Sequence, residues 1–280
     1  MAVRRSTLFH SPPSSATGLP SLVFAHANGF TGSSYQSFLQ PLENRFAVHT
    51  LDRLGHHPSY PVTPNWQLLR EELLAYLAEF PGPVIGVGHS MGGVVMAMAA
   101  LKAPKRFRCL VMLDPPLMVG MDAMALKLAK RFNLVDRITP AGKSRGRRAS
   151  WPSHDAMHSD LRVKGLFRRF TPQALEDYVK GATRVDKDGR VHLIFEPRIE
   201  TEIFRHLPDH LWRLPRKLEV PTALLAGSES DLITPYRRKR LERRGLRVDT
   251  VPGGHMYPME HPEETRRILL ATLEQLLETS

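Results

Sequence analysis

The pentapeptide GHSMG, residues 88–92, carries the strongest chemical signal in the chain, because it places a serine between two glycines. A serine hydroxyl raised on a tight strand-to-helix turn can act as a nucleophile, and the flanking glycines leave room for that turn. The pentapeptide follows the apolar run PVIGVGH and opens the alanine-rich run SMGGVVMAMAA. This context favours Ser90 as a nucleophile over the alternative, a serine in an ordinary glycine-rich turn.

A serine nucleophile needs a base, because its hydroxyl reacts poorly until a nearby group takes the proton. His255 in VPGGHMYPMEHPE is the best candidate among the 13 histidines, since it follows the last expected strand behind two glycines. His261 lies nearer the start of the closing helix and is expected to be exposed or to cap that helix. His56 and His57 are expected in a loop.

An acid should orient the histidine and stabilise its charged form. We predict Asp231 in LLAGSESDLITP for this role, because it follows the strand before the last one and is freed from the sheet by small polar residues. Asp114, at the end of VMLD, is the main rival, and Glu229 is a weaker third. The predicted chain order is Ser90, Asp231, His255.

Two backbone amides should stabilise the negative charge that forms when a nucleophile attacks a carbonyl group. The amide of Met91 lies at the start of the helix after Ser90, where the helix dipole adds to the effect. For the second donor we predict Asn28, in a glycine-containing loop directly after the apolar run SLVFAH, with Ala27 or Gly29 as alternatives. Three side chains near these turns are expected to line a substrate pocket, although the two histidines also suit structural hydrogen bonds: His26, His89 and Phe30.

Short apolar runs alternate with longer helical patterns along the chain, which predicts an α/β fold with a mostly parallel, doubly wound sheet. The runs are apolar throughout, as expected of strands that are covered on both faces. The expected strands are residues 21–26, 46–51, 83–89, 107–114, 221–227 and 246–254, with a further edge strand possible at STLFH (6–10). The expected helices are residues 34–45, 65–80, 90–103, 236–245 and 262–279.

The alternation stops after Asp114 and returns near residue 214, so the sequence predicts a core of residues 1–114 and 214–280 with a helical cap, residues 115–213, inserted into it. One hairpin is expected in the cap at TRVDKDGRVHLIFEP, where KDG supplies the turn. The apolar side chains of PPLMVGMDAMALKLAKRF and GLFRRF either line an acyl site or pack the cap onto the core.

Composition places the chain among ordinary globular proteins, with 280 residues, 42% hydrophobic and 24% charged. The net charge of +11 comes from basic clusters at 143–148, 162–170 and 236–247, which we interpret as solvated faces rather than a nucleic-acid site. The single cysteine, Cys109, excludes an internal disulfide and is expected in a buried strand. No apolar run is long enough to span a membrane, so a cytoplasmic protein is expected.

These motifs resemble the α/β-hydrolase superfamily over nearly the whole chain. HANGF resembles the family's oxyanion loop, with Ala27 in the usual glycine position, and GHSMGG matches its nucleophile elbow. GSESDLITP resembles the acid loop, and GGHMYPMEHPEE the histidine loop. DGRVHLIFEPRIE is similar to the end of the cap in capped members. LDRLGHHPS resembles a further family loop, except that His57 replaces an expected glycine.

The resemblance implies a serine hydrolase that forms an acyl-enzyme on Ser90 and needs no metal or organic cofactor. HDAMH (154–158) spaces two histidines like zinc ligands but lacks the expected glutamate placement. A small carboxylic ester is the first expectation for the substrate, with Arg168 or Arg169 as possible contacts to an acidic one. Thioesters, lactones and carbon–carbon bonds remain open, as do a largely noncatalytic binding role and the oligomeric state.

Overall fold

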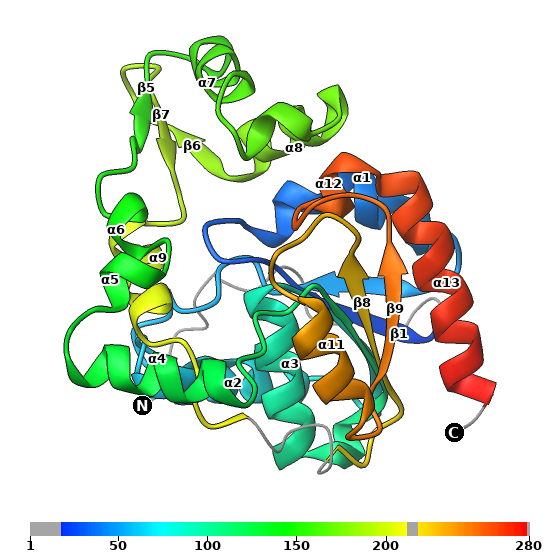
Figure 1. Ribbon diagram of the computed structural model, residues 1–280. Coiled ribbons are helices and arrows are strands. Elements are labelled where there is room, and N and C mark those ends of the chain that lie inside the picture. The colour runs from blue at the N-terminus through cyan, green and yellow to red at the C-terminus, as the bar shows by residue number, and fades with distance from the viewer. Residues whose placement is uncertain (1–17, 212–217, 279–280) are drawn as a thin grey trace, which may run out of the picture.

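The computed structural model describes residues 18–211 and 218–278 and is built around a six-stranded parallel sheet (Figure 1). Adjacent strands follow the order β2-β1-β3-β4-β8-β9, and every neighbouring pair is parallel. The strands are β1 (Ser21–Ala25), β2 (Ala47–Thr50), β3 (Val84–His89), β4 (Phe107–Leu113), β8 (Thr222–Gly227) and β9 (Arg247–Val251). The predicted α/β fold and these six strands are confirmed, whereas the possible strand at residues 6–10 lies outside the described residues.

Side chains alternate between the two faces of the sheet, and each face builds its own hydrophobic core. In β1, Val23 and Ala25 join a cluster with α2 (Gln67–Leu77), α3 (Met91–Lys102) and α11 (Pro235–Glu242). Leu22 and Phe24 point the other way, toward α1 (Gln36–Leu39) and α13 (Pro262–Glu278). Both faces are therefore buried, which explains why the strands are apolar throughout.

The helices agree with the predicted segments, with one difference in the first. The expected helix at residues 34–45 is divided into a 3-10 turn η2 (Gly32–Tyr35), the short α1 and a second 3-10 turn η3 (Gln40–Asn44). Pro41 lies at the start of η3. Its backbone nitrogen carries no hydrogen, so it cannot donate the hydrogen bond that a continuing α-helix needs there. The remaining short elements of the core are η4 (Pro64–Trp66), η5 (Pro104–Arg106) and α12 (Tyr257–Glu260).

The chain between β4 and β8 leaves the sheet, and we call residues 115–211 the insertion. Its helices are α4 (Met121–Arg131), α5 (Val135–Ile138), α6 (Ala141–Ser144), α7 (His154–Arg162), η6 (Phe167–Arg169), α8 (Pro172–Gly181) and α9 (Pro197–Arg205). The predicted hairpin is confirmed as β6 (Thr183–Val185) paired with β7 (Val191–Leu193), with Gly189 at φ +77° in its turn. The predicted boundary at 213/214 lies outside the described residues.

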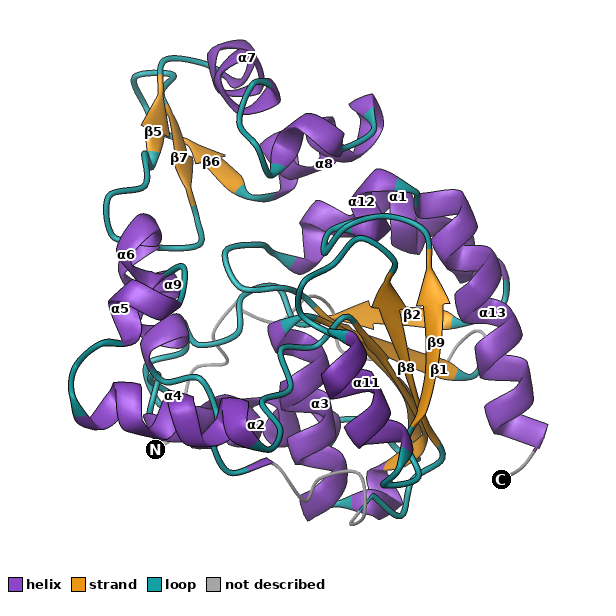
Figure 2. Ribbon diagram, in the orientation of Figure 1, coloured by secondary structure: helices purple, strands orange, loops and turns teal. Residues whose placement is uncertain are grey.

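The insertion is not purely helical. β5 (Ser150–Trp151) pairs with β7 to make a three-stranded antiparallel sheet, an addition that a strand of two residues does not reveal in the sequence. In Figure 2 the insertion lies on the side toward which the arrowheads of the central sheet point, so it covers the carboxyl-end edge of that sheet. Contacts from α8 to η2, α1 and α12 join it to the core.

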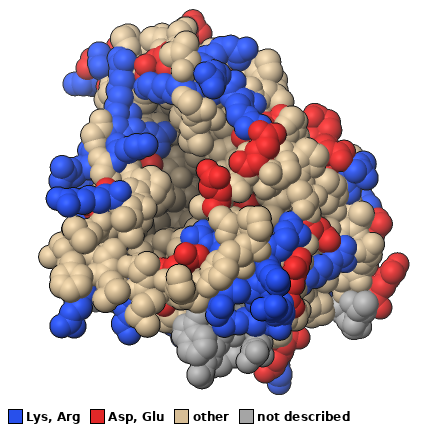
Figure 3. All heavy atoms as spheres, in the orientation of Figure 1, with Lys and Arg blue, Asp and Glu red and all other residues tan. Residues whose placement is uncertain are grey.

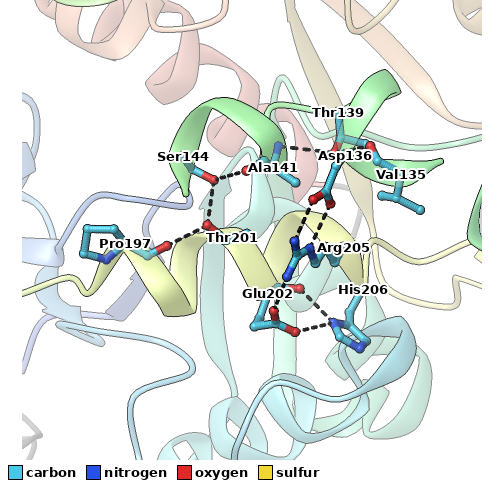
Figure 4. Close-up of polar contacts among 10 residues, drawn as sticks. All are labelled: Val135, Asp136, Thr139, Ala141, Ser144, Pro197, Thr201, Glu202, Arg205 and His206. Carbon is cyan, nitrogen blue, oxygen red and sulfur yellow. Dashed lines mark hydrogen bonds and ion pairs between the residues drawn. The ribbon is translucent and has the colours of Figure 1, made fainter. Parts of the chain in front are cut away.

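Polar contacts hold the helices of the insertion together (Figure 4). The Arg205 guanidinium on α9 donates two hydrogen bonds to the Asp136 carboxylate on α5, at 2.8 and 2.6 Å. Ser144 on α6 and Thr201 on α9 bring their hydroxyl oxygens to 3.0 Å. Because α5, α6 and α9 are all short, these side-chain contacts fix an arrangement that helix propensity alone does not secure.

Candidate active site

Ser90 lies on the sharp turn between β3 and α3, with φ +54° and ψ −117°. Such a positive φ is costly for a residue with a side chain and persists only where the surroundings enforce it. The enforcement is tight packing: a Cβ on Gly92 would lie 2.1 Å from the Ala25 carbonyl oxygen, and one on Gly88 would lie 2.5 Å from the Gly92 carbonyl carbon. The two glycines therefore let α3 press onto β1 and β3, as the motif predicts.

The structure brings Ser90 and His255 together across 165 residues of sequence. His255 Nε2 lies 3.0 Å from Ser90 Oγ, and its Nδ1 lies 2.7 Å from Asp114 Oδ2. Ser90 is 8% exposed and Asp114 is fully buried, while the His255 side chain keeps 30% of its surface accessible. A hydroxyl, an imidazole and a carboxylate are thus joined in one line of hydrogen bonds.

The carboxylate at His255 is Asp114, so the prediction of Asp231 for this contact is wrong. Asp231 is exposed and lies four residues beyond the end of β8. Asp114 directly follows β4, which pairs with β3 on one side and β8 on the other. Its φ of +43° turns the carboxylate away from the strand direction and toward the histidine loop.

The loop after β8 instead supplies hydrogen-bond donors to Asp114. The Gly227 amide donates to Asp114 Oδ1 at 3.2 Å, and the Ser230 hydroxyl donates to Oδ2. Nearby, Tyr257 donates its hydroxyl to the Leu225 carbonyl oxygen, and burial together with the Asp114 charge holds the pKa of Tyr257 well above its ordinary value. The motif GSESD therefore holds the carboxylate of Asp114 in place, although Asp114 itself follows β4.

Of the predicted amide donors, Met91 directly follows Ser90, and Asn28 lies in the loop after β1, the strand that pairs with β3. The Ala27 amide is already used, since it donates to the Tyr35 hydroxyl at 3.2 Å, which removes Ala27 as an alternative. Within the described chain, the backbone amides of Asn28 and Met91 have no hydrogen-bond acceptor. The Gly92 amide donates to the His26 carbonyl oxygen at 3.2 Å and so ties the Asn28 loop to the elbow.

His26 and His89 do not line a pocket, which corrects that expectation, and the alternative of structural hydrogen bonds is confirmed for both. His26 is fully buried and bonds the Ala27 carbonyl and the Leu54 amide through its two ring nitrogens. Burial lowers the pKa of His26 to about 4. His89 is equally buried, and burial followed by the charge of His255 holds its pKa well below the ordinary value. Both imidazoles are neutral parts of the scaffold.

His89 joins the two loops that flank Ser90. Its Nε2 lies 2.9 Å from the His255 carbonyl oxygen, which only accepts, so His89 donates there. Its Nδ1 then accepts from the Tyr35 hydroxyl at 2.7 Å. Since Tyr35 also accepts from Ala27, a continuous line of hydrogen bonds runs from the Asn28 loop to the backbone of His255. The sequence marks His89 as suited to structural hydrogen bonds, but no pattern in it marks Tyr35.

Phe30 is also buried, at 3% exposure, and packs against the insertion rather than facing an open pocket. The centroid of its ring lies 4.8 Å from that of Tyr178. The ring centroids of Phe167, Phe170 and Tyr35 lie 6.3, 6.2 and 6.0 Å away, respectively. The Tyr178 hydroxyl donates to the Gly29 carbonyl oxygen at 3.3 Å. The insertion therefore touches the loop that carries Asn28.

An ion pair of the insertion lies against the same loop. Arg147 Nη1 donates to Glu200 Oε2 at 2.8 Å, and the guanidinium also donates to the Tyr178 hydroxyl. The Asn28 amide side chain donates to the Glu200 carbonyl oxygen at 3.0 Å. A Cβ on Gly29, which has φ +79°, would lie 2.9 Å from both Arg147 and Glu200. Glycine is needed here for backbone conformation and for space.

Arg169 belongs to a contact between the insertion and the histidine loop. Its guanidinium meets Glu229 at 2.8 Å and Glu260 at 3.0 Å, and Glu260 accepts from the Gly254 amide at 2.9 Å. Glu229, the weakest candidate for the acid, is thus paired with Arg169. Arg168 is exposed, and His261 is exposed at the start of α13.

Figure 3 shows the surface hollowed between the insertion and the core, with Lys and Arg gathered on the insertion's rim. A cavity of about 340 Å³ lies between the chain after β2 and the β6–β7 hairpin. Its lining residues are Asp52, Arg53, Arg184, Leu193, Ile194 and Glu196, and Ser90, His255 and Asp114 are not among them.

Comparison with known proteins agrees with this geometry. The family model described as "Alpha/beta hydrolase family" matches residues 22–268, so the chain belongs to the alpha/beta hydrolase family. The Abhydrolase domain-containing protein AFT2-1 of Alternaria alternata is 25% identical over 236 residues, which are 69% of this chain and 84% of that protein. Family and fold together indicate a hydrolase.

A shorter similarity reaches a protein with a named reaction. The pimeloyl-[acyl-carrier protein] methyl ester esterase of Aliivibrio salmonicida is 31% identical over 90 residues, 32% of this chain and 34% of that protein. Among solved structures, E-2-(acetamidomethylene)succinate hydrolase superposes with a TM-score of 0.74 at 21% identity and covers 91% of each chain. At that identity the likeness establishes the fold alone.

Proposed function

We propose that the protein is a serine hydrolase that cleaves a carboxylic ester, with Ser90 as nucleophile, His255 as base and Asp114 as the acid that orients His255. One observation carries the proposal: the line of hydrogen bonds from Ser90 Oγ through both ring nitrogens of His255 to Asp114 Oδ2, at 3.0 and 2.7 Å. A nucleophile, a base and an orienting group in that arrangement are what acyl transfer requires.

The reaction follows from the roles of the three groups. His255 Nε2 takes the hydroxyl proton as Ser90 Oγ bonds to the ester carbonyl carbon, and Asp114 stabilises the imidazolium. The amides of Asn28 and Met91 donate to the oxyanion of the tetrahedral intermediate. The bond to the alcohol oxygen then breaks, and His255 protonates the departing alcohol. Water, deprotonated by His255, attacks the acyl carbon. The bond from that carbon to Ser90 Oγ then breaks, His255 returns the proton to Ser90, and the acid leaves.

The choice of an ester rests on the local similarity to a methyl ester esterase. We propose that the insertion acts as a cap that selects the substrate, because it contacts the loop carrying Asn28 through Tyr178 and the histidine loop through Arg169. The basic rim seen in Figure 3 favours a substrate that carries negative charge away from the scissile bond.

Stopped-flow hydrolysis of three p-nitrophenyl esters tests the proposal: the acetate, the butyrate and the monoester of glutaric acid. The last of these carries a free carboxylate away from the scissile bond. We expect a burst of p-nitrophenol that is stoichiometric with protein if the acyl-serine accumulates, and loss of turnover in Ser90→Ala. Ser59→Ala, at an exposed position, serves as the control and should leave turnover unchanged.

Three outcomes decide between the candidate functions. Turnover that survives Ser90→Ala would contradict the serine mechanism. A burst without turnover would favour a binding protein on a hydrolase scaffold. Faster turnover of the matched thioester or lactone would support the serine mechanism but show that the preferred substrate is a thioester or a lactone rather than an ester.

A further inference from the structure

The outer face of α4 is apolar, although it is the face exposed to solvent. Six of the eleven exposed large hydrophobic side chains in the described part of the chain fall within residues 121–138. Four of them form a line along α4 and its end, at spacings of three or four residues, and we call them the α4 ridge: Met121, Met124, Leu128 and Phe132. Their exposure ranges from 49% for Leu128 to 76% for Met121.

The opposite face of α4 already fulfils the packing role of an amphipathic helix. Ala123, Leu126 and Ala129 are buried there, spaced three residues apart. On a helical wheel they lie about half a turn from the α4 ridge. The ridge is therefore a second apolar face, which packing of α4 on the rest of the protein does not explain.

Charges around the α4 ridge have one sign. Asp122 and Asp136 are the only acids in residues 121–138. Each is neutralised by an ion pair, Asp122 with Arg237 at 2.6 Å and Asp136 with Arg205 at 2.6 Å (Figure 4).

Of the four cations in residues 121–138, Lys130 pairs with Asp209 at 2.9 Å, and the other three face solvent. Exposed Lys127, Arg131 and Arg137 have no carboxylate partner within the described ranges 18–211 and 218–278. The segment therefore presents apolar side chains flanked by unneutralised positive charge. In Figure 3 the surface over α4, at the lower left, is mostly neutral with Lys and Arg at its margins.

We propose that the α4 ridge docks the protein on the surface of an anionic phospholipid bilayer. A helix with one apolar face and lysines or arginines beside it lies in the plane of the membrane interface, with its apolar side chains among the acyl chains and its cations at the lipid phosphates. α4 is suited to this because it forms a convex edge of the molecule (Figure 1). None of the described helices is long and apolar enough to cross a membrane, so the contact is one of attachment to the surface.

A second copy of the chain fits the α4 ridge less well. A two-fold contact would place Lys127 and Arg131 of one copy near the same residues of the other, and each copy carries a net charge of +11. Like charges at such a contact oppose association. An acidic protein would satisfy the charges, but the ridge is a convex row of protruding side chains rather than a groove, which suits a fluid surface better.

Vesicle co-sedimentation of the full chain tests the docking proposal. We expect binding to vesicles of equal parts phosphatidylcholine and phosphatidylglycerol and little binding to pure phosphatidylcholine. The double variant Leu128→Ser/Phe132→Ser should weaken the binding at least tenfold, and Lys127→Gln/Arg131→Gln should weaken it and reduce its dependence on salt. Val163→Ser, at a 77% exposed site elsewhere on the insertion, is the matched control and should bind as the wild type does.

Because the substituted side chains are exposed, the variants should fold as the wild type does, and circular dichroism with thermal melting checks this. Absence of binding to the anionic vesicles would overturn the proposal, as would binding that Leu128→Ser/Phe132→Ser leaves intact. A dimer in sedimentation equilibrium that this variant dissociates would assign the ridge to contact between copies instead. Retention on immobilised polyglutamate, lost in the same variant and without vesicle binding, would assign it to an acidic protein.

Discussion

Asp114 owes its position to its backbone as much as to its side chain. Its amide donates to the Leu225 carbonyl oxygen at 2.8 Å, which continues the β4–β8 ladder by one residue, and its φ of +43° then swings the carboxylate toward His255. Three donors meet that carboxylate, from Gly227, Ser230 and His255. A carboxylate met by this many donors is fixed in position and can orient His255.

Replacing Asp114 should therefore be far more costly than replacing Asp231. Asn tolerates the positive φ at position 114, so Asp114→Asn should fold, but it removes the charge that orients His255. We expect kcat/KM for an ester to fall about 10⁴-fold in this variant. Asp231→Asn, at an exposed position, should stay within about twofold of the wild type. Equal losses in the two variants, or a larger loss at Asp231, would refute the assignment of Asp114.

Tyr35 provides a second test at the scale of single residues. Tyr35→Phe leaves the Ala27 amide and His89 Nδ1 without their partner in a buried environment. Unpaired buried groups cost about 1–3 kcal/mol each, so losing both partners should lower the free energy of unfolding in urea by about 2 kcal/mol or more. Tyr236→Phe, 44% exposed, should change it by less than about 0.5 kcal/mol. A Tyr35→Phe protein as stable as this control would show that the network contributes nothing.

At the scale of elements, the nucleophile turn depends on how closely α3 approaches β1. Gly92 lies in the first turn of α3, where any Cβ would collide with the Ala25 carbonyl group. The Cβ would be fixed to the backbone of α3 and the carbonyl belongs to the backbone of β1, so no side-chain rotation can relieve the collision. This is why the motif has glycine there, and why Ser90 is held in its strained conformation.

Gly92→Ala should accordingly destabilise the whole fold. Overpacking of this kind costs about 3 kcal/mol or more, equivalent to a fall in Tm of at least about 6 °C for a protein of this size. Gly82→Ala, where a Cβ would meet nothing within 4 Å, is the matched control and should leave Tm within about 2 °C. Differential scanning calorimetry measures both, and similar melting temperatures would contradict the close approach.

The central sheet could be predicted from the sequence because buried parallel strands produce uninterrupted apolar runs with short links. Ser90 and His255 could be predicted because each occupies a glycine-bounded turn after such a run. The acid could not, since Asp114 and Asp231 both follow apolar strands. Which of them meets His255 depends on the φ of one residue and on hydrogen bonds from Gly227 and Ser230. The burial of His26 and His89 and the pairing of β5 with β7 likewise depend on contacts between segments far apart in the sequence.

At the scale of the whole molecule, the insertion and the core meet beside the active site. Arg169 pairs with Glu229 and Glu260 of the core, and the Thr171 amide donates to the Met259 carbonyl oxygen at 3.0 Å. The Arg169–Glu229 pair is about half exposed, so it is weak and sensitive to salt. The packing of Phe30 against the insertion is buried and supplies the apolar part of the contact.

Hydrogen exchange at the Thr171 amide reports on local opening of this contact between the insertion and the core. Arg169→Gln should speed exchange of this amide about twofold to fivefold, as expected for the loss of an exposed ion pair worth up to about 1 kcal/mol. High salt should remove the difference. Arg168→Gln changes the neighbouring exposed arginine and should leave the rate unchanged. Faster exchange in both variants would indicate a general charge effect rather than a contact of Arg169.

Labelling with a fluorophosphonate tests most directly whether Ser90, His255 and Asp114 form a working nucleophilic site. Intact mass and peptide mapping of the full chain should find one adduct, on Ser90, that is absent in Ser90→Ala and forms much more slowly in Asp114→Asn than in Asp231→Asn. Folded wild-type protein that takes no label, or takes it at another residue, would contradict the account.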